Sequence, residues 1–537
     1  MPILPVRQLG ALGVVRDTSP YDLPPNGWSA CNNVRFSNGR VLRAPVFREL
    51  HGDIQLGDLG SCEGIERPDG SPAVIIASAD GRVHSWAGDV TDVLQATARP
   101  VSSLPMQAFT LGHVLYVNRG DRPPLSMIPS ASVLTDCPAW PSATTSARVL
   151  RPFGDRLIAL NMLEDGDERP MRIRWSDPAP IHLEPATWDA AATTGTAGFN
   201  DLSRVRTAIL DGLQLGSQFI VYASDCVVRV SHIGGPFVFR FDDLWSDDGI
   251  IATNAVAEMD GRHYVFGTRS IYMHDGVSRV NIARGRVQRF VFDHLDFTMR
   301  HRCHVFADSI RREVLFCYIS GDNDVSFRDT AFANKAAVYN VDEGTWSFRD
   351  LPNVAAFSTV ILGVSRSWAA AGNSWEDQGG TFASQGGTTT PCVVCVSSAS
   401  PDAGLTSCNL FGVDNSGIGS ILGTAVAHET VTDAWVMREG IDFDETGVSL
   451  DTVKMLKSVY PQVNLPTSDI EIAVGASDYP QPLTTQWNPP CIISQAGSYR
   501  IDSIATGRYI GIRVCMPGTS DFELSGMDLD LEILGRA

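Results

Sequence analysis

The chain has 537 residues, of which 44% are hydrophobic, and its formal net charge is −19. This surplus of carboxylates excludes a protein that grips nucleic acid through lysine and arginine, although DNA could slide along an acidic wall. No apolar run approaches the roughly 18 residues of a membrane span, and no basic start leads into a signal-type apolar core. We therefore expect no membrane span and synthesis in the cytosol.

Glycine and proline are frequent, with 48 and 31 residues, while charged residues make up only 19% of the chain. This composition favours short strands joined by tight turns over long surface helices, and it predicts an all-β protein. The length exceeds what one hydrophobic core usually serves. We therefore expect two or three domains, or a repeat architecture that spreads the core around a ring.

Residues 1–50 have no helical periodicity and are predicted to form an extended arm that leads into a first hairpin. Asn38 and Gly39 are a residue pair that suits a two-residue hairpin turn, because both positions of such a turn take a positive φ. The hairpin should therefore pair the residues on either side of this turn.

Between residues 51 and 423 a strand–turn–strand unit recurs about every 40 residues. Its turns are predicted at residues 80–81, 112, 154–155, 223–225, 260–261, 275–276, 309–311 and 342–344. This interval is typical of a β-propeller, in which each repeat is a small antiparallel sheet, and it predicts about six or seven blades. A pair of β-sandwiches remains an alternative. No WD40 signature is present, so a propeller of that type is not expected.

Residues 424–537 are predicted to form a separate C-terminal domain. Apolar and polar residues alternate in the segments 434–437, 453–460, 470–474, 509–514 and 522–533, with turns between them. Alternation with a period of two at this density indicates a small antiparallel β-sandwich.

Two segments lack apolar periodicity and are predicted to be long loops. Residues 365–391 are rich in Ala, Gly, Ser and Thr, and residues 320–334 form the second segment. Long loops in compact domains are often mobile or functional. A passive insertion at a blade edge explains residues 365–391 equally well.

Enzyme signatures are missing from the sequence. It contains no G-x-S-x-G elbow, no H-E-x-x-H, no Walker loop and no G-x-G-x-x-G after a strand. The best metal candidate by residue type is the patch of His294, His301, Cys303 and His304. On a strand, His301 and His304 would point to opposite faces, and neighbouring arginines would repel a cation. We therefore expect no catalytic residue, no cofactor and no metal site.

Two acidic stretches are interpreted as solvated turns. Asp442 and Asp444 match the first ligand positions of a calcium loop, but Val453 stands where such a loop has a bidentate Glu. Residues 164–168, with sequence EDGDE, are expected to form an exposed acidic loop.

Eleven cysteines in a chain without a signal segment are expected to be free thiols. Cys392 and Cys395 lie in one apolar run, where positions i and i+3 of a strand point to opposite faces. They are therefore predicted to be buried separately and to share no metal.

Residues 340–346, with sequence NVDEGTW, resemble the Asp-box turn of sialidase-type propellers. In that turn an Asp caps the backbone and a Trp packs between strands. Here the turn occurs once and is one residue short. We expect the packing role, but no catalysis, because no pair of nucleophile and acid accompanies it.

Several segments, in this order, resemble the tail-hub and tail-nozzle proteins of short-tailed bacteriophages, including those named phage stabilisation proteins. The matching segments are DLPPNGW (22–28), NVRF (33–36), GRVLR (39–43), FGDRLI (153–158), RWSD (174–177), FIVYASD (219–225), REVLF (312–316), AVYN (337–340), TWS (345–347), KSVYP (457–461), IAVGA (472–476), RYIGIR (508–513) and LSG (524–526). Each segment alone is short, and their shared order carries the resemblance. Residues 365–391 have no counterpart in it.

The resemblance implies a structural virion protein and no enzyme. It implies a homohexameric ring below the portal and adaptor, a conduit for DNA that passes without specific binding, and an attachment surface for tail fibres, spikes or a needle. The protein would be assembled in the host bacterial cytoplasm and reside in the virion tail. Loop length and composition suggest candidate channel-gating residues, which are Ser365, Trp368, Gly379, Gly380, Gly386 and Gly387 in the first loop and Gly321, Asp322 and Asn323 in the second.

Two other functions stay open at this point. A glycan-binding or sialidase-like propeller on a receptor-binding tail component is suggested by the Asp-box-like turn and by Trp86, Trp368 and Trp375, which we expect to be exposed. A cytosolic scaffold propeller unrelated to viruses is the third hypothesis.

Overall fold

Strands hold 57% of the chain and helices 4%, which confirms the all-β prediction. The structure is a computed structural model. It describes residues 3–51, 59–66, 72–78, 80–87, 91–95, 104–192, 195–235, 237–322, 326–328, 331–362, 390–399, 402, 408–413, 430, 432–444, 452–464, 469–479, 484–494, 499–519 and 521–536. Within these residues, no helix has the length and apolar character needed to cross a membrane.

Five four-stranded antiparallel sheets follow one another along the chain, and in each sheet every strand pairs with the next. The first two sheets consist of β6 (Leu59–Glu66), β7 (Pro72–Ser78), β8 (Val83–Trp86), β9 (Thr91–Gln95), β10 (Gln107–Leu111), β11 (Val114–Asn118), β12 (Leu125–Met127) and β13 (Thr135–Asp136). The next three consist of β14 (Ser146–Phe153), β15 (Arg156–Glu164), β16 (Asp167–Trp175), β17 (Gly198–Asp201), β18 (Ile209–Leu215), β19 (Gln218–Ala223), β20 (Val227–His232), β21 (Phe239–Trp245), β22 (Val256–Met259), β23 (Arg262–Phe266), β24 (Ile271–His274) and β25 (Arg279–Asn281).

Turn chemistry explains why these strands pair with their neighbours in the sequence. Between β22 and β23, Asp260 and Gly261 take φ of 54° and 70°. A turn with two left-handed residues matches the twist of a tight hairpin, and Asp and Gly tolerate that conformation. The turn predicted there is therefore present.

The sixth sheet has seven strands in the order β26-β27-β28-β29-β30-β31-β5. These are β26 (His304–Asp308), β27 (Glu313–Tyr318), β28 (Ala333–Asn340), β29 (Trp346–Leu362), β30 (Thr390–Ser397), β31 (Asn409–Val413) and β5 (Phe47–His51). The first half of β29 pairs with β28 and its second half pairs with β30, so one long strand joins both parts of the sheet.

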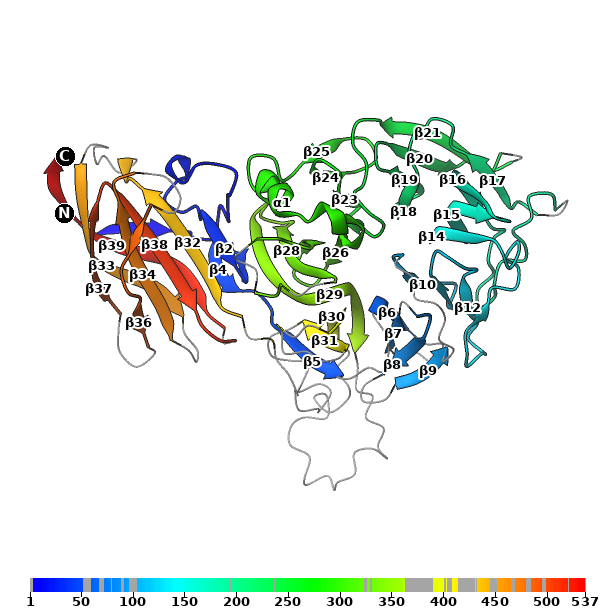
Figure 1. Cartoon of the computed structure of the whole chain (residues 1–537), viewed down its shortest axis with the longest axis horizontal. Helices are drawn as coiled ribbons and strands as arrows, with labels where there is room; N and C mark the ends of the chain where they lie inside the picture. Colours follow the sequence, from blue (N-terminus) through cyan, green and yellow to red (C-terminus); the bar gives the residue numbers. More distant parts are fainter. Residues whose placement is uncertain are drawn as a thin grey trace, which may run out of the picture.

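The six sheets pack in a succession that returns to its start. The first strand of each sheet contacts the first strand of the next, in the order β6, β10, β14, β18, β22 and β26, and β29 of the last sheet contacts β6. In Figure 1 the sheets are arranged around a common centre in this order. Separate apolar clusters fill four of the interfaces, between the first and second, second and third, third and fourth, and sixth and first sheets.

Two six-stranded sheets form the remaining part of the chain. One has the order β3-β4-β39-β33-β37, with β1 also paired to β39, and the other has the order β2-β32-β38-β34-β35, with β36 paired to β34. Their strands are β1 (Leu4–Arg7), β2 (Ala30–Asn32), β3 (Val34–Ser37), β4 (Arg40–Arg43), β32 (Ala434–Ile441), β33 (Thr452–Asn464), β34 (Ile470–Ser477), β35 (Gln486–Trp487), β36 (Cys491–Ile493), β37 (Ile501–Gly507), β38 (Tyr509–Met516) and β39 (Glu523–Arg536). The two sheets share one apolar core.

The strands β1 to β4 belong to these two sheets, whereas residues 1–50 were expected to form an extended arm and a first hairpin. The predicted hairpin is present, with β3 and β4 paired around Asn38 and Gly39. β1 pairs with β39 across almost the full length of the chain, β2 pairs with β32, and β5 enters the seven-stranded sheet. In Figure 1 both termini lie together at the outer end of these two sheets.

The helical segments were not expected from the sequence. α1 (Gln288–His294) follows the fifth sheet, and the 3-10 helix η2 (Phe297–Arg302) leads into β26; a third short helix, η1 (Pro20–Asp22), lies near β32. The histidine patch that was considered as a strand is therefore partly helical.

Candidate functional site

A cluster of polar side chains lies where the first strands of the sheets meet. We call Glu63, Arg151, Asp211, Asn254 and Ser358 the central polar cluster. Arg151 on β14 forms a two-pronged ion pair with Asp211 on β18, with Nε 3.0 Å from Oδ1 and Nη2 2.9 Å from Oδ2. The Asp211 side chain is fully buried. Its remaining acceptor positions take the N–H groups of Gly212 and Asn254, both at 2.7 Å.

Asn254 connects four sheets through one residue. Its amide oxygen accepts from Arg151 Nη2 at 2.6 Å, and its Nδ2 donates to the carbonyl of Met106, next to β10, at 3.2 Å. Its carbonyl accepts from the N–H of Val305 on β26 at 2.8 Å. Asn254 holds φ at 64°, a left-handed conformation that Asn adopts more readily than most residues. This conformation lets its backbone and side chain face different sheets.

Glu63 and Ser358 extend the cluster to the first and last sheets. The N–H of Gly64 donates to Ser358 Oγ at 2.9 Å, which joins β6 to β29. Burial raises the pKa of Glu63 to about 7, against the opposing influence of Arg151 and a hydrogen bond with Ser358. The cluster thus holds the Asp211 carboxylate within a set of four donor contacts, and it holds a second carboxyl group, Glu63, whose charged form is disfavoured by burial.

A chain of hydrogen bonds joins the fourth and fifth sheets. Tyr222 Oη lies 2.7 Å from His263 Nδ1 and 2.6 Å from His274 Nε2, and all three side chains are buried. His263 Nε2 must carry a proton because it contacts the carbonyl of Gln214 at 2.9 Å, and His274 Nδ1 must lack one because it accepts from the N–H of Gly276 at 3.2 Å. His274 therefore donates to Tyr222, and Tyr222 donates to His263.

This arrangement requires both imidazoles to be neutral. Burial lowers the pKa of His263 to about 4, and burial together with His263 lowers the pKa of His274 to about 3. Every donor and acceptor along the chain has a partner, so the group stabilises the contact between two sheets and offers no free base for catalysis.

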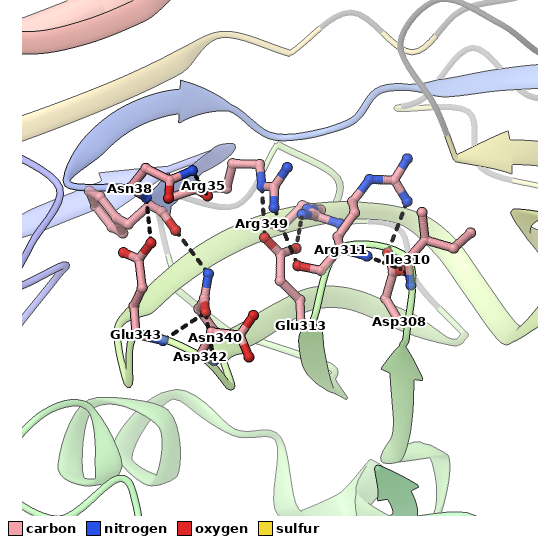
Figure 2. A network of polar contacts seen from close by, with 12 residues as sticks. Arg35, Asn38, Asp308, Ile310, Arg311, Glu313, Asn340, Asp342, Glu343 and Arg349 are labelled. Atoms are coloured by element: carbon pink, nitrogen blue, oxygen red, sulfur yellow. Dashed lines mark hydrogen bonds and ion pairs between the residues drawn. The ribbon is translucent and has the colours of Figure 1, made fainter. Parts of the chain in front are cut away.

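Charged residues join the N-terminal hairpin to the seven-stranded sheet (Figure 2). Arg35 Nε on β3 lies 2.8 Å from Glu313 Oε1 on β27, and Arg349 Nη2 on β29 lies 3.2 Å from Glu313 Oε2. The side chains of Glu313 and Arg349 are 1% and 2% exposed. At the hairpin turn, the N–H of Asn38 donates to Glu343. The hairpin is thus held to this sheet at β3 and at its turn.

A second set of contacts lies beside this ion-pair network. Asn33 Oδ1 accepts from the N–H of Asp350 at 2.9 Å, and Asn32 Nδ2 donates to Asp350 Oδ2 at 2.7 Å. Asn33 takes φ of 53°, which turns the chain from β2 into β3. β2 and β3 belong to different terminal sheets, so both sheets are anchored to the same strand, β29.

Of the predicted gating residues, the structure describes Gly321 and Asp322. The N–H of Gly321 donates to the carbonyl of His294 at 2.9 Å, and Asp322 Oδ2 lies 3.9 Å from Lys335 Nζ. Ser365, Trp368, Gly379, Gly380, Gly386, Gly387 and Asn323 lie outside the described residues.

Asn334 holds the described start of the second predicted loop. Its Oδ1 accepts from the N–H of Ser320 at 2.7 Å, and its Nδ2 donates to the carbonyls of Ser320 at 3.1 Å and Phe327 at 3.0 Å. The side chain of Lys335 is 4% exposed, so its ion pair with Asp322 is sheltered from water. This segment is anchored to β28.

The histidine patch does not gather as ligands. His304 is buried on β26, where burial lowers its pKa to about 4, while His301 is exposed on η2 and His294 Nδ1 contacts the carbonyl of Phe290 at 2.8 Å. Across the described residues, no group of three or more His, Cys, Asp or Glu side chains is placed to hold a metal ion.

The Asp-box-like turn serves packing. Asn340 Oδ1 accepts from the N–H groups of Asp342 and Glu343, both at 3.0 Å, and Trp346 is 1% exposed. Trp346 Nε1 donates to the carbonyl of Ile282 at 3.1 Å. Trp86, which we expected to be exposed, is fully buried, because it packs beside Cys62 and Val74 between the first and last sheets. Trp368 and Trp375 lie outside the described residues.

The two cysteines of the C-x-x-C stretch are buried on opposite faces of β30, as predicted. Cys392 belongs to the apolar cluster against the first sheet, and Cys395 belongs to the cluster inside the seven-stranded sheet. Near β32, Asp442 Oδ1 accepts from the N–H of Asp444 at 3.1 Å, the pattern of a capped turn.

Sequence reasoning missed the central polar cluster and the Tyr222 chain. Their residues come from strands of different sheets, and single polar residues within apolar strands gave no motif. The one available signal was charge within a mostly buried strand, such as Arg148 and Arg151 in Ser146–Phe153.

No family model and no curated protein matches this chain. Among solved structures, it is similar to the extracellular domain of a hybrid two-component system from B. thetaiotaomicron, with 11% identity and a TM-score of 0.27. The similarity covers 52% of this chain and 39% of that chain, so the chain spans well under half of the solved structure it matches.

Proposed function

We propose that this protein is a structural component of a short-tailed phage tail, which forms a nozzle or hub ring below the portal and adaptor. In this proposal it has no catalytic activity, DNA passes through the ring without specific binding, and fibres, spikes or a needle attach to its outer surface. It is assembled in the host bacterial cytoplasm and resides in the virion.

The succession of sheet contacts supports a six-bladed propeller within this proposal. Five blades are the four-stranded sheets, and the sixth is the seven-stranded sheet, whose β29 meets β6. The two terminal sheets are proposed to be a β-sandwich. A propeller leaves few unpaired strand edges, which suits a part that must keep its shape under load.

The observation that carries the function is the ion-pair junction at Glu313. Its buried carboxylate joins the terminal sheets to the proposed propeller through Arg35 and Arg349. A subunit that transmits force around a ring needs its parts held rigidly, and a buried network fixes one geometry because misplacing it would strand a charge. The ordered sequence segments that resemble nozzle proteins lie in both parts.

The glycan-binding alternative has lost most of its support. Its Asp-box-like turn is occupied in packing, and Trp86 is buried. The central carboxylate of Asp211 is held in an ion pair with Arg151, whereas a glycosidase requires two carboxyl groups flanking a substrate.

Cryo-electron microscopy of the purified protein and of virions tests the proposal. We expect a closed ring of copies, and density for the same ring in tails. A protein that stays monomeric at every concentration and is absent from tails would refute the proposal.

A gate in the lumen is proposed at residues 365–391 or 320–334. Deleting residues 323–325 leaves Ser320 and Asn334, and therefore the anchor of the second loop, in place. Premature genome release from phages that carry this deletion, or a deletion within residues 365–391, would identify the gate. Retention of DNA in both would contradict it.

A further inference from the structure

Arginine is concentrated in one short part of this acidic chain. Residues 262–312 contain ten arginines and four aspartates, whereas the whole chain has a net charge of −19. Several of these arginines line a hollow of about 350 Å³ beside α1, formed by Arg269, Arg284 and Arg289 around Phe292. The hollow is therefore a positive site on a negative protein.

The charges of this hollow are not neutralised within the chain. In the described part of the protein, the guanidinium groups of Arg269 and Arg284 make no ion pair or hydrogen bond, and both residues are exposed. Arg289 approaches Asp293 at 3.4 Å, but both side chains are largely exposed, so water screens that pair. Asp17 also lines the hollow, and its two oxygens accept the N–H groups of Arg289 and Phe290 at 3.0 and 3.1 Å.

A protruding acidic element with the opposite charge lies on another sheet. The hairpin of β15 and β16 carries Asp165 in its turn and Asp167 and Glu168 at the start of β16, and all three residues are exposed. Glu164 at its base is already paired with Arg172 and Arg174. Asp165 accepts from the hydroxyls of Ser142 and Thr144, and Asp167 pairs at 3.1 Å with the half-exposed Arg169, so the tip keeps an excess of negative charge.

We propose that this acidic turn inserts into the arginine hollow of a second copy of the chain. In Figure 1, β15 and β16 lie on the far side of the arrangement of sheets from α1, so the turn cannot reach the hollow of its own chain. A carboxylate-bearing turn and a guanidinium-lined hollow are complementary in charge, and arginine binds carboxylate with two parallel hydrogen bonds. Because the two surfaces differ, the contact is head-to-tail and repeats from copy to copy.

This inference rests on the ring assembly proposed above, and it adds which two surfaces make the contact. A nucleic-acid phosphate is the competing occupant. The net charge of −19 opposes the approach of DNA, and a single compact hollow does not follow a phosphate backbone as a basic stripe would.

A charge exchange between the two surfaces tests the contact. One full-length variant carries R269E and R284E, and a second carries D167R and E168R. We expect each variant alone to lose self-association in sedimentation velocity at low salt, by at least tenfold in the association constant. We expect an equimolar mixture of the two to recover association, because the reversed charges attract again.

The control is R204E with R240E, which reverses two exposed arginines of other sheets and should associate as the wild type does. Wild-type association in the R269E/R284E variant would overturn the proposed surfaces and leave the ring itself standing. Failure of the mixture to associate would also overturn them. A wild-type protein that is monomeric and absent from tails would refute the ring as well. A third outcome would assign the hollow to phosphate instead. In that outcome the wild type binds a DNA duplex, the R269E/R284E variant does not, and the two proteins have the same mass in solution.

Discussion

Arg151 and Asp211 form a two-pronged ion pair, with distances of 3.0 and 2.9 Å, between the first strands of two neighbouring sheets. The Asp211 side chain has no exposure to solvent, and that of Arg151 is 16% exposed. Removing the arginine would leave a buried carboxylate with only backbone donors. The pair therefore stabilises the place where the sheets converge.

We predict that Arg151→Met lowers the free energy of unfolding by about 3–5 kcal/mol, the usual cost of stranding one member of a buried pair. Urea denaturation followed by tryptophan fluorescence measures it. The matched control is Arg204→Met, which removes an exposed arginine paired with Asp243 and should leave the free energy of unfolding nearly unchanged, because water screens this pair. Equal losses in the two variants would contradict a special role for Arg151.

Gly64 marks the close approach of β6 to β29. A Cβ atom at this position would lie 2.4 Å from the carbonyl oxygen of Thr359 and 2.9 Å from Cβ of Val360. We predict that Gly64→Ala forces the first and last sheets apart and lowers the free energy of unfolding by about 1–3 kcal/mol.

Hydrogen exchange should show faster exchange in β6 and β29 of Gly64→Ala than in the wild type. Gly321→Ala is the control, because the nearest atom to its added Cβ is 4.0 Å away. Unchanged exchange in Gly64→Ala would contradict the prediction, because it would mean that the added methyl group is accommodated without separating the two strands.

The buried histidines predict loss of stability in acid. The pKa values of His263 and His274 are lowered to about 4 and about 3 in the folded protein, while unfolded histidine titrates near 6.5. Between these pKa values the unfolded chain binds more protons than the folded protein. The free energy of unfolding therefore falls as the pH drops from about 6.5 to about 4. The slope is at most about 1.4 kcal/mol per pH unit for each histidine.

Glu63 has the opposite effect on the dependence of stability on pH. Its pKa is raised to about 7, so the folded protein binds the extra proton and stability falls as the pH rises from about 4.5 to about 7.

A comparison of variants separates the effect of the histidines from that of Glu63. Replacing His263 and His274 by Gln should flatten the acid slope relative to the wild type, whereas replacing the exposed His182 should not. The measurement is the denaturant midpoint of each protein as a function of pH. If the wild type and the His263/His274 variant show the same slope, the two buried histidines do not take up protons on unfolding.

Asn334 is predicted to control the order of the segment that follows β27. Asn334→Ala removes three hydrogen bonds to Ser320 and Phe327, so amide exchange in residues 320–322 and 326–328 should rise, while exchange in β15 should not change. Loss of stability should be about 1–3 kcal/mol, since buried backbone groups are left without partners. Asn488→Ala, at a more exposed site, is a suitable control. An unchanged exchange pattern would mean that other contacts hold this segment.

Local signals in the sequence were enough to predict strands and hairpins of this protein. Alternating apolar residues and turn pairs such as Asn38–Gly39 and Asp260–Gly261 predicted strands and hairpins that are present, because these signals depend on conformations a few residues long. The period of two also placed Cys392 and Cys395 on opposite faces of one strand.

The contacts between distant segments could not be predicted from the sequence and are seen in the folded protein. Residues 1–50 were expected to form an extended arm and a first hairpin. Leu4 instead pairs with Leu529, and Arg35 of the hairpin forms an ion pair with Glu313. The partners of Arg151 and of Tyr222 lie on other sheets. Such contacts depend on the balance of burial, charge and hydrogen bonding over the whole chain, and no short stretch of sequence contains that balance.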